Sequence, residues 1–240
     1  MRIDYSQEDK TIITQYDYIN EILASLLENM KGTIVHPARK HMFTANEKAT
    51  KLDEKTSADL FHHYITQLLF ISKWARPDLQ TAIAFMCTQI MAPDVDDYNK
   101  LACVMNHLQL YPRLPLILES DGKMNIYWSV DAAFAVHNGM RCHTGAHMTL
   151  EQGTVVGIFT KQKLNTRSST ESELVSFDEP LPIILWSRIF AIAQLMNIDD
   201  NILYQDNISA IRMENNGKAS CTKRTKHIDI RYFYITDKVK

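Results

Sequence analysis

The sequence predicts an α/β protein in which a mixed β-sheet flanked by helices follows a smaller, mainly helical segment. In the first 110 residues, apolar side chains recur at helical spacing. From residue 125 onward, strand-like runs come first and helical and strand-like runs then alternate. A break with two prolines at residues 111–115 lies between the two patterns. We therefore predict two domains, residues 1–115 and residues 122–240.

Four helices are predicted in the first segment from the spacing of their apolar residues. They cover residues 19–30, 60–75, 79–91 and 98–110. Pro77 ends the second helix near Ala75, because a residue that precedes proline is biased away from helical geometry. Acidic residues at 94–97 suit the N-terminal end of the fourth helix, where they interact favourably with its dipole.

The second segment mixes period-2 and helical patterns. Strands are predicted at residues 125–131, 147–150, 154–159 and 202–205, and helices from Ser169, over residues 183–196 and over residues 208–215. The second and third strands form a hairpin around residues 151–153. Pro180 and Pro182 interrupt the helix that begins near Ser169, because proline removes a helical hydrogen bond. Three strands followed by alternating helix and strand indicate a mixed sheet.

Composition and charge exclude several classes of protein. With 240 residues and 45% apolar residues, the chain can form a packed core. Its net charge is −2, and neither half is strongly basic: 12 Lys+Arg against 15 Asp+Glu in residues 1–120, and 14 against 13 in residues 121–240. Nucleic-acid binding would therefore depend on two local basic patches, each of which also reads as a solvated loop. These patches are Lys161, Lys163 and Arg167, and Lys223, Arg224 and Lys226.

The location of the protein is indicated by its cysteines and by the lack of targeting signals. Cys87, Cys103, Cys142 and Cys221 are scattered without a CxxC motif, which is typical of free thiols in a reducing compartment. The N-terminal residues have no apolar core of a secretory signal, and no run is long and apolar enough to span a bilayer. We expect a protein that is intracellular, neither secreted nor bound to a membrane.

Four carboxylates in separate parts of the second segment suggest a metal-dependent nuclease. Asp131 and Asp206 each end a strand-like apolar run, Glu173 lies in the first turn of a helix, and Asp229 opens a final amphipathic segment. Carboxylate clusters bind hard divalent cations, which can activate water and stabilise a leaving oxygen in phosphodiester cleavage.

Each of these carboxylates also has a simpler interpretation. Glu173 could bond back to Thr170 in a capping box, and Glu171 offers the same box with Ser168. Glu171 and Glu173 lie on different faces of a helix, so they cannot easily enter one cluster together. The pair Asp206-Asn207 could cap the following helix. In the last segment, Asp237 is an alternative to Asp229.

A zinc site is a second possibility in the same half of the chain. His137, Cys142, His143 and His147 lie close together in sequence. Their spacing lacks the paired C-x2-C and H-x3-H arrangement of structural zinc sites. We therefore do not favour zinc.

Five segments in a fixed order resemble the ribonuclease H domain of copia-type retrotransposon polyproteins. They are VDAAFA at 130–135, RCHTG at 141–145, KQKLNTRSSTESEL at 161–174, YQDNISA at 204–210 and KRTKHIDIRYF at 223–233. Upstream, residues 69–85 and 104–108 resemble the region between the reverse-transcriptase palm and ribonuclease H in those polyproteins. The resemblance implies that residues 1–115 are a thumb or connection segment, without the palm's polymerase site.

The resemblance also implies an activity, a cofactor and partners. The protein would be an endonuclease that cuts the RNA strand of RNA·DNA hybrids, using two Mg²⁺ ions for which Mn²⁺ can substitute. Asp131 would bridge the ions, Glu173 and Asp206 would hold one of them, and Asp229 would hold the other. Asn207 and the two basic patches would contact nucleic acid. The remainder of the polyprotein would be a partner, in cytoplasmic virus-like particles or in the nucleus.

Two departures from the family pattern keep an alternative open. Ala146 stands where the family usually has a second glycine, and the helix after Glu173 carries two prolines, which are unusual there. If Pro180 kinked that helix, the cluster would be misplaced, and an error of about 1 Å can cost roughly a hundredfold in rate. The alternative is a degenerate, non-catalytic fragment that at most binds a hybrid or a protein partner.

Overall fold

Helices and strands form two separate units in the chain, which we describe from a computed structural model. The structure describes residues 1–38, 41–44, 46, 48–53, 57–120, 122–137 and 139–216. One unit comprises Met1–Asp121 with Gln152–Phe159, and the other comprises Gly122–Glu151 with Thr160–Lys240. The chain is therefore of mixed α/β class, as the sequence predicts.

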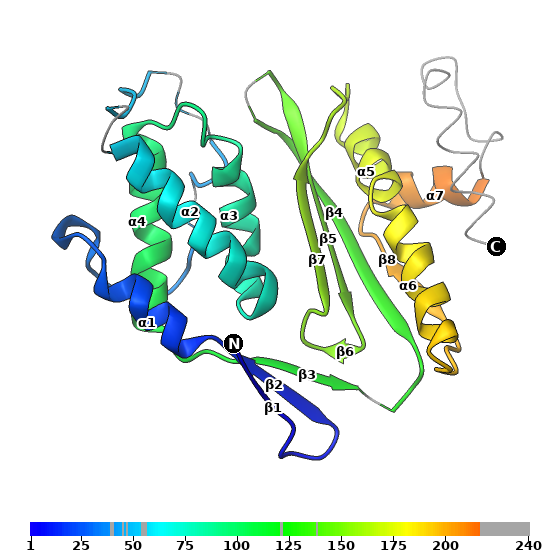
Figure 1. The fold of residues 1–240 in the computed structure, drawn as a ribbon. Helices are drawn as coiled ribbons and strands as arrows, with labels where there is room; N and C mark the ends of the chain where they lie inside the picture. Colours follow the sequence, from blue (N-terminus) through cyan, green and yellow to red (C-terminus); the bar gives the residue numbers. More distant parts are fainter. Residues whose placement is uncertain are drawn as a thin grey trace. The chain divides into compact units, whose positions relative to one another are not determined.

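The first unit contains the four predicted helices (Figure 1). They are α1 (Tyr16–Ala24), α2 (Ser57–Trp74), α3 (Gln80–Cys87) and α4 (Val95–Leu110), with short 3₁₀ helices η1 (Glu28–Met30) and η2 (Pro77–Leu79). Their apolar faces meet in one core, which includes the fully buried Phe61, Ile65 and Met105. Asp94 and Asp97 form a capping box at the start of α4, which explains the acidic residues before it.

The first helix is shorter than predicted, because its last turn is interrupted. The Ser25 hydroxyl donates a hydrogen bond of 2.8 Å to the Ile22 carbonyl, and such a local bond competes with the helical pattern. The chain then continues through Leu27 in an extended conformation into η1. The apolar periodicity up to Met30 therefore reflects burial and not one continuous helix.

A small sheet, in which strands of the first unit pair antiparallel, was not predicted. It contains β1 (Arg2–Asp4), β2 (Lys10–Thr14), β3 (Leu116–Ser120) and β6 (Glu151–Gln152), in the order β1-β2-β3-β6. Lys10 lies opposite Glu119, and their side chains form a salt bridge of 3.1 Å. The segment before the predicted sheet is therefore not purely helical, and β3 lies between the two predicted domains, residues 1–115 and 122–240.

Gly153 follows β6 in a conformation that glycine adopts without strain. Its φ is +79°, and a Cβ atom at this position would lie 2.1 Å from the Ile117 carbonyl oxygen. The expected hairpin turn at residues 151–153 is thus a point where the chain approaches β3 closely. The strand after it, β7, covers Val156–Lys161.

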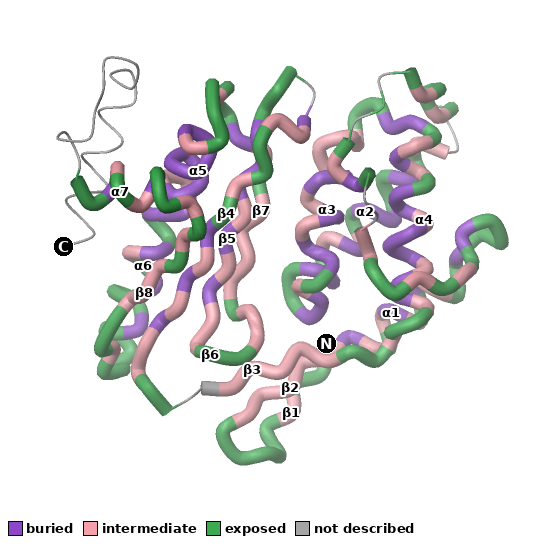
Figure 2. The backbone as a smooth tube through the Cα atoms, turned by 180° about the vertical axis from the view of Figure 1, so that it is seen from behind, coloured by how far each residue is buried: buried purple, intermediate pink, exposed green. Residues whose placement is uncertain are grey.

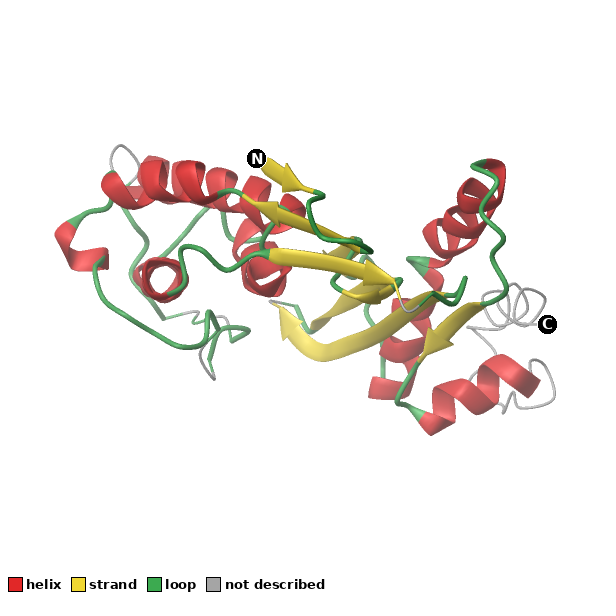
Figure 3. Ribbon diagram, turned by 90° about the horizontal axis from the view of Figure 1, so that it is seen from below, coloured by secondary structure: helices red, strands yellow, loops and turns green. Residues whose placement is uncertain are grey.

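The second unit is built on a mixed sheet, as the sequence predicts. The strands of this unit lie in the order β5-β4-β8, and the end of β7 at Thr160–Lys161 belongs to the same sheet. The long β4 (Ile126–His137) pairs antiparallel with β5 (Arg141–Thr149) and parallel with β8 (Asn201–Tyr204). Three helices accompany the sheet: α5 (Ser169–Asp178), α6 (Leu181–Ala193) and α7 (Ile208–Asn216) (Figure 3). Trp128 on β4 is fully buried, so β4 is a central strand.

The two prolines lie beyond the helix that carries Glu173. Helix α5 ends at Asp178, Pro180 is the N-cap residue of α6, and Pro182 lies in the first turn of α6. Proline fits the first turn of a helix, where its missing N–H group is not needed. The prolines therefore separate two helices and do not kink α5.

Burial differs among the three helices of the second unit. Helix α5 is buried over residues 171–177 (Figure 2). Helix α6, in contrast, exposes Trp186, Ile189 and Phe190. Among the described residues, Cys87, Cys103 and Cys142 form no disulfide. No helix in the described part of the chain is both long and apolar enough to cross a membrane.

Candidate metal centre

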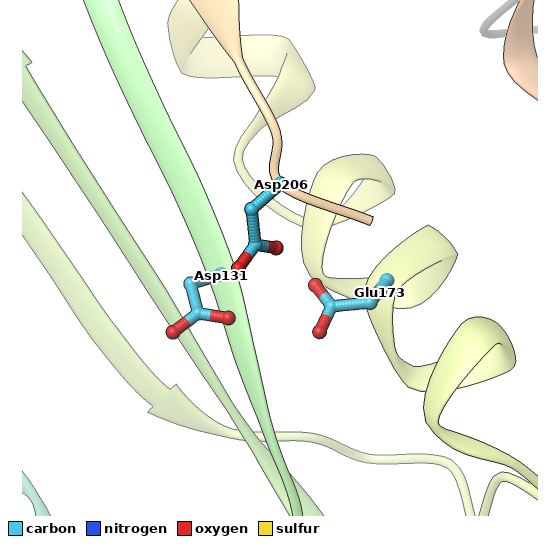
Figure 4. Close-up of side chains that lie close together, drawn as sticks. All are labelled: Asp131, Glu173 and Asp206. Carbon is cyan, nitrogen blue, oxygen red and sulfur yellow. The ribbon is translucent and has the colours of Figure 1, made fainter. Parts of the chain in front are cut away.

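Three of the four candidate carboxylates meet in the second unit (Figure 4). Asp131, Glu173 and Asp206 each offer one oxygen atom, and these atoms all lie within 4.8 Å of one another. The three side chains come from β4, from α5 and from the turn after β8. Among the described residues, no other group of three or more potential ligands has this geometry.

The sheet register brings the two aspartates together. In the parallel ladder, Ser129 of β4 lies opposite Tyr204 of β8. Asp131 and Asp206 each follow two residues later, so both lie at the level where β8 ends, although β4 does not end at Asp131 as predicted and continues to His137. The end of a parallel strand such as β8 is a position at which α/β proteins commonly bind ligands. Gly145 lies opposite Asp131 on the other side, in β5.

The third carboxylate is presented by the first half of α5. Ser168 caps the helix by accepting a hydrogen bond from the Glu171 backbone, and the Glu171 carboxylate accepts one from the Arg167 backbone. Glu171 is therefore the residue that closes the cap. Glu173 lies on another face of the helix, is 6% exposed and belongs to the cluster.

Asn207, not Asp206, caps the next helix. The Asn207 side-chain oxygen accepts hydrogen bonds of 3.1 Å from the backbones of Ser209 and Ala210 at the start of α7. Asp206 is thereby left exposed, with its carboxylate in the cluster. The expected contact of Asn207 with nucleic acid stays a prediction.

The cluster concentrates negative charge on a buried carboxylate. Burial, together with the nearby Asp131 and Asp206, raises the pKa of Glu173 to about 7. The Gln205 amide opposes this rise by donating a hydrogen bond of 3.2 Å to Glu173 Oε2. A divalent cation would relieve the same repulsion, so these residue types and their proximity fit Mg²⁺ or Mn²⁺.

Sequence reasoning missed two residues beside the cluster. The Gln205 side chain also accepts hydrogen bonds from the backbones of Asp206 and Asn207, so it ties the turn after β8 to α5. Glu214 on α7 is 5% exposed, and burial and Glu173 raise the pKa of Glu214 to about 7. Its spacing of four residues from the buried Ala210 is the sequence signal that could have placed it on the inner face of α7.

Several predicted site residues fall outside the part of the chain that the structure describes. They are the fourth carboxylate Asp229, its alternative Asp237, and the basic residues Lys223, Arg224 and Lys226. The other basic patch is described. Lys163 and Arg167 are exposed in the segment between β7 and α5, and Lys161 at the end of β7 is half-buried.

The histidines and cysteine considered for zinc do not converge on one point. His137 and His143 form a hydrogen bond with each other, with 2.9 Å between Nε2 and Nδ1. Cys142 instead lies 3.2 Å from the Thr166 hydroxyl. Burial lowers the pKa of both imidazoles to about 4, so this histidine pair is neutral at physiological pH. No three of these side chains are grouped closely enough to share an ion in the described structure.

Comparison with known proteins points to a retroelement. The chain is similar to the retrovirus-related Pol polyprotein from transposon TNT 1-94 of Nicotiana tabacum, with 24% identity over 236 residues. The match covers 96% of this chain and 17% of that polyprotein. It supports an origin in a retrotransposon polyprotein. No protein-family model and no solved structure matches the chain.

Proposed function

We propose that the chain is a retroelement ribonuclease H of the copia type, which hydrolyses the RNA strand of RNA·DNA hybrids as part of a larger polyprotein. The observation that carries this proposal is the meeting of Asp131, Glu173 and Asp206 within 4.8 Å. The similarity to a Pol polyprotein over nearly the whole chain supports it. A ribonuclease H-like fold for residues 122–240 is part of the same proposal, supported by the mixed sheet with β4 between β5 and β8.

The proposed cofactor is a pair of Mg²⁺ ions. When bound, such ions activate water and stabilise the leaving oxygen in phosphodiester hydrolysis. Asp131, Glu173 and Asp206 would hold them, and Asp229 would complete the set. The exposure of Asp131 and Asp206 leaves one side of the cluster open to a large substrate, while the third ligand, Glu173, is buried.

The proposed substrate is recognised through charge and shape. Lys161, Lys163 and Arg167 precede α5 in sequence and would contact phosphate groups of the hybrid. Contacts with 2′-hydroxyl groups would distinguish the RNA strand from the DNA strand. Residues 1–115 would serve as a thumb or connection segment that joins this domain to the rest of the polyprotein.

The unbroken helix α5 argues against a degenerate fragment. A kink at Pro180 was the main physical reason to expect a misplaced Glu173, and Pro180 lies after the end of α5. Three carboxylates that are held together by three separate elements are also costly to keep in a protein without cations, because their charges repel each other.

A cleavage assay tests the proposal. Purified protein is incubated with a labelled RNA·DNA hybrid in Mg²⁺, in Mn²⁺ and in EDTA, beside the variant Asp206→Asn. We expect loss of the RNA strand with either metal, leaving 5′-phosphate ends, and no loss in EDTA or with the variant. Intact hybrid under all conditions, or equal cleavage by Asp206→Asn, would reject ribonuclease H activity.

A further inference from the structure

A buried glutamine is hydrogen-bonded to the helix that carries Glu173. Gln162 follows β7 and is completely buried, although it stands between two lysines that were considered for phosphate binding. Its backbone N–H donates to the Cys142 carbonyl at 2.9 Å, so the main chain at this position is fixed to β5. The side chain therefore points into the protein, in contrast to the exposed Lys163.

Both hydrogen bonds of the Gln162 amide are directed at groups that determine the position of α5. Nε2 donates to the Ser172 carbonyl at 2.9 Å and to the Thr144 hydroxyl at 3.1 Å. Ser172 is the residue directly before Glu173. The amide thus connects the strand region of the sheet with the turn of α5 that presents the buried carboxylate.

The same network fixes the far end of the helix. The Thr144 hydroxyl donates a hydrogen bond of 2.7 Å to Glu179, the residue after the end of α5. Thr144 is completely buried and lies opposite Ala132 in the β4–β5 ladder, next to the pair of Asp131 and Gly145. One hydrogen-bonded chain therefore joins two points of α5 to the strand that pairs with Asp131.

The side-chain oxygen of Gln162 indicates that this residue is not optimised for stability alone. Oε1 is buried and has no hydrogen-bond partner among the described residues. A buried acceptor without a partner is unfavourable, and an apolar side chain of the same shape would avoid that cost. The two donated bonds are the feature that such a replacement would lose.

We infer that Gln162 is a positioning residue, which together with Thr144 sets the place of Glu173 relative to Asp131 and Asp206. This inference rests on the proposed metal-dependent function. Residues that hold a metal ligand in position affect metal affinity without contacting the metal, because a displaced ligand binds the metal less well. Gln162 and Thr144 act through the backbone of α5 and through Glu179, and neither touches the cluster oxygens in the described structure.

The test compares Mn²⁺ binding to the full chain and to four variants by titration calorimetry, with melting temperatures as the control for folding. Gln162→Met removes both donors and keeps the length of the side chain. Thr144→Val removes the hydroxyl, and Thr144→Ser keeps it. Gln152→Met makes the same chemical change as the first variant at an exposed position.

We expect Gln162→Met and Thr144→Val to raise the dissociation constant for Mn²⁺ by about tenfold or more, a range typical of such residues. Thr144→Ser and Gln152→Met should stay within about twofold of the unchanged protein, which is well below that range. In the hybrid assay, kcat should fall for the first two variants while KM stays unchanged. Thr144→Val exchanges the hydroxyl for a methyl group, whereas Thr144→Ser keeps the hydroxyl and loses the methyl group. This pair is therefore sufficient for the test if Gln162→Met does not fold.

Two results would overturn the inference, and they are distinguishable. Normal Mn²⁺ affinity of folded Gln162→Met or Thr144→Val, beside an unchanged protein that binds Mn²⁺, rejects the positioning role and leaves the proposed function intact. Absence of Mn²⁺ binding in the unchanged protein rejects the metal centre itself, and the positioning role with it.

Discussion

Ser129 on β4 lies opposite Tyr204 on β8, and each residue precedes a candidate metal ligand by two positions. Because the two strands run parallel, this register brings Asp131 of β4 to the same level as Asp206, which follows the end of β8. A shift of one residue in either strand would turn its carboxylate to the other face. The geometry of the centre is therefore determined by strand pairing in the protein core.

Replacing Asp131 by asparagine should abolish stabilisation by metal. The change keeps the size of the side chain and removes one negative charge from the cluster. The loss of Mn²⁺ affinity should exceed the roughly 10–100-fold loss that is typical when a residue that orients a metal ligand is replaced. Melting temperatures with and without Mn²⁺ measure the effect. The exposed Asp199→Asn is the matched control, and equal Mn²⁺ stabilisation of both variants would contradict the assignment.

Mn²⁺ affinity should rise with pH up to about 7 and then level off. Burial and the neighbouring aspartates raise the pKa of Glu173 to about 7, so a cation must displace a proton from it below that pH. One displaced proton corresponds to roughly tenfold in affinity per pH unit. Calorimetric titrations between pH 5.5 and 8 check this. An affinity independent of pH below 7 would show that Glu173 does not ligate the metal as a carboxylate.

Glu214 should make the metal-free protein less stable as pH rises from about 4.5 to about 7. Its pKa is raised in the folded protein, so the folded state keeps a proton that the unfolded chain, with the ordinary value of 4.5, has already released. The stabilisation is complete below 4.5 and is lost as pH passes 7. Histidines 137 and 143 contribute in the opposite direction, so the measurement is a difference between proteins.

The relevant comparison is Glu214→Gln against the unchanged chain, in EDTA, by denaturant unfolding at several pH values. The variant should gain stability relative to the unchanged protein as pH rises through this window. A difference that is constant with pH, or that changes in the opposite direction, would show that the Glu214 carboxyl does not hold its proton in the folded state.

Pro180→Ala should have little effect on the metal centre. Pro180 stands at the start of α6, where proline fits the helix, and it lies beyond the end of α5. Its replacement should lower the free energy of unfolding by about 0.4–1 kcal/mol, through greater freedom of the unfolded chain. Mn²⁺ affinity should not change. A marked increase in affinity would mean that Pro180 displaces Glu173 after all.

Local sequence patterns were sufficient for most elements of the second unit. The apolar run before Asp131, the cap at Ser168 and the strand before Asp206 are each encoded within a few residues. Helical periodicity also predicted that Glu171 and Glu173 do not enter one cluster together, because residues two positions apart lie on different faces of a helix. The structure places Glu173 in the cluster and Glu171 in the cap.

Features that depend on contacts between residues far apart in the sequence could not be predicted. Strand β2 pairs with β3 about a hundred residues later, as in the opposition of Lys10 and Glu119, and neither short strand carries a strong pattern alone. The burial of Gln162 was missed for a similar reason. Its neighbours in sequence are lysines, whereas its hydrogen-bond partners Thr144 and Ser172 lie 18 and 10 residues away.

The most direct test is an anomalous-diffraction map from crystals of the protein soaked in Mn²⁺. The account predicts a peak about 2.0–2.2 Å from carboxylate oxygens of Asp131, Glu173 and Asp206, distances typical of small divalent cations with such ligands. It also predicts that Asp206→Asn weakens or removes this peak. A map without a peak among these three residues, at Mn²⁺ concentrations that saturate known nuclease sites, would contradict the metal centre and the proposed activity.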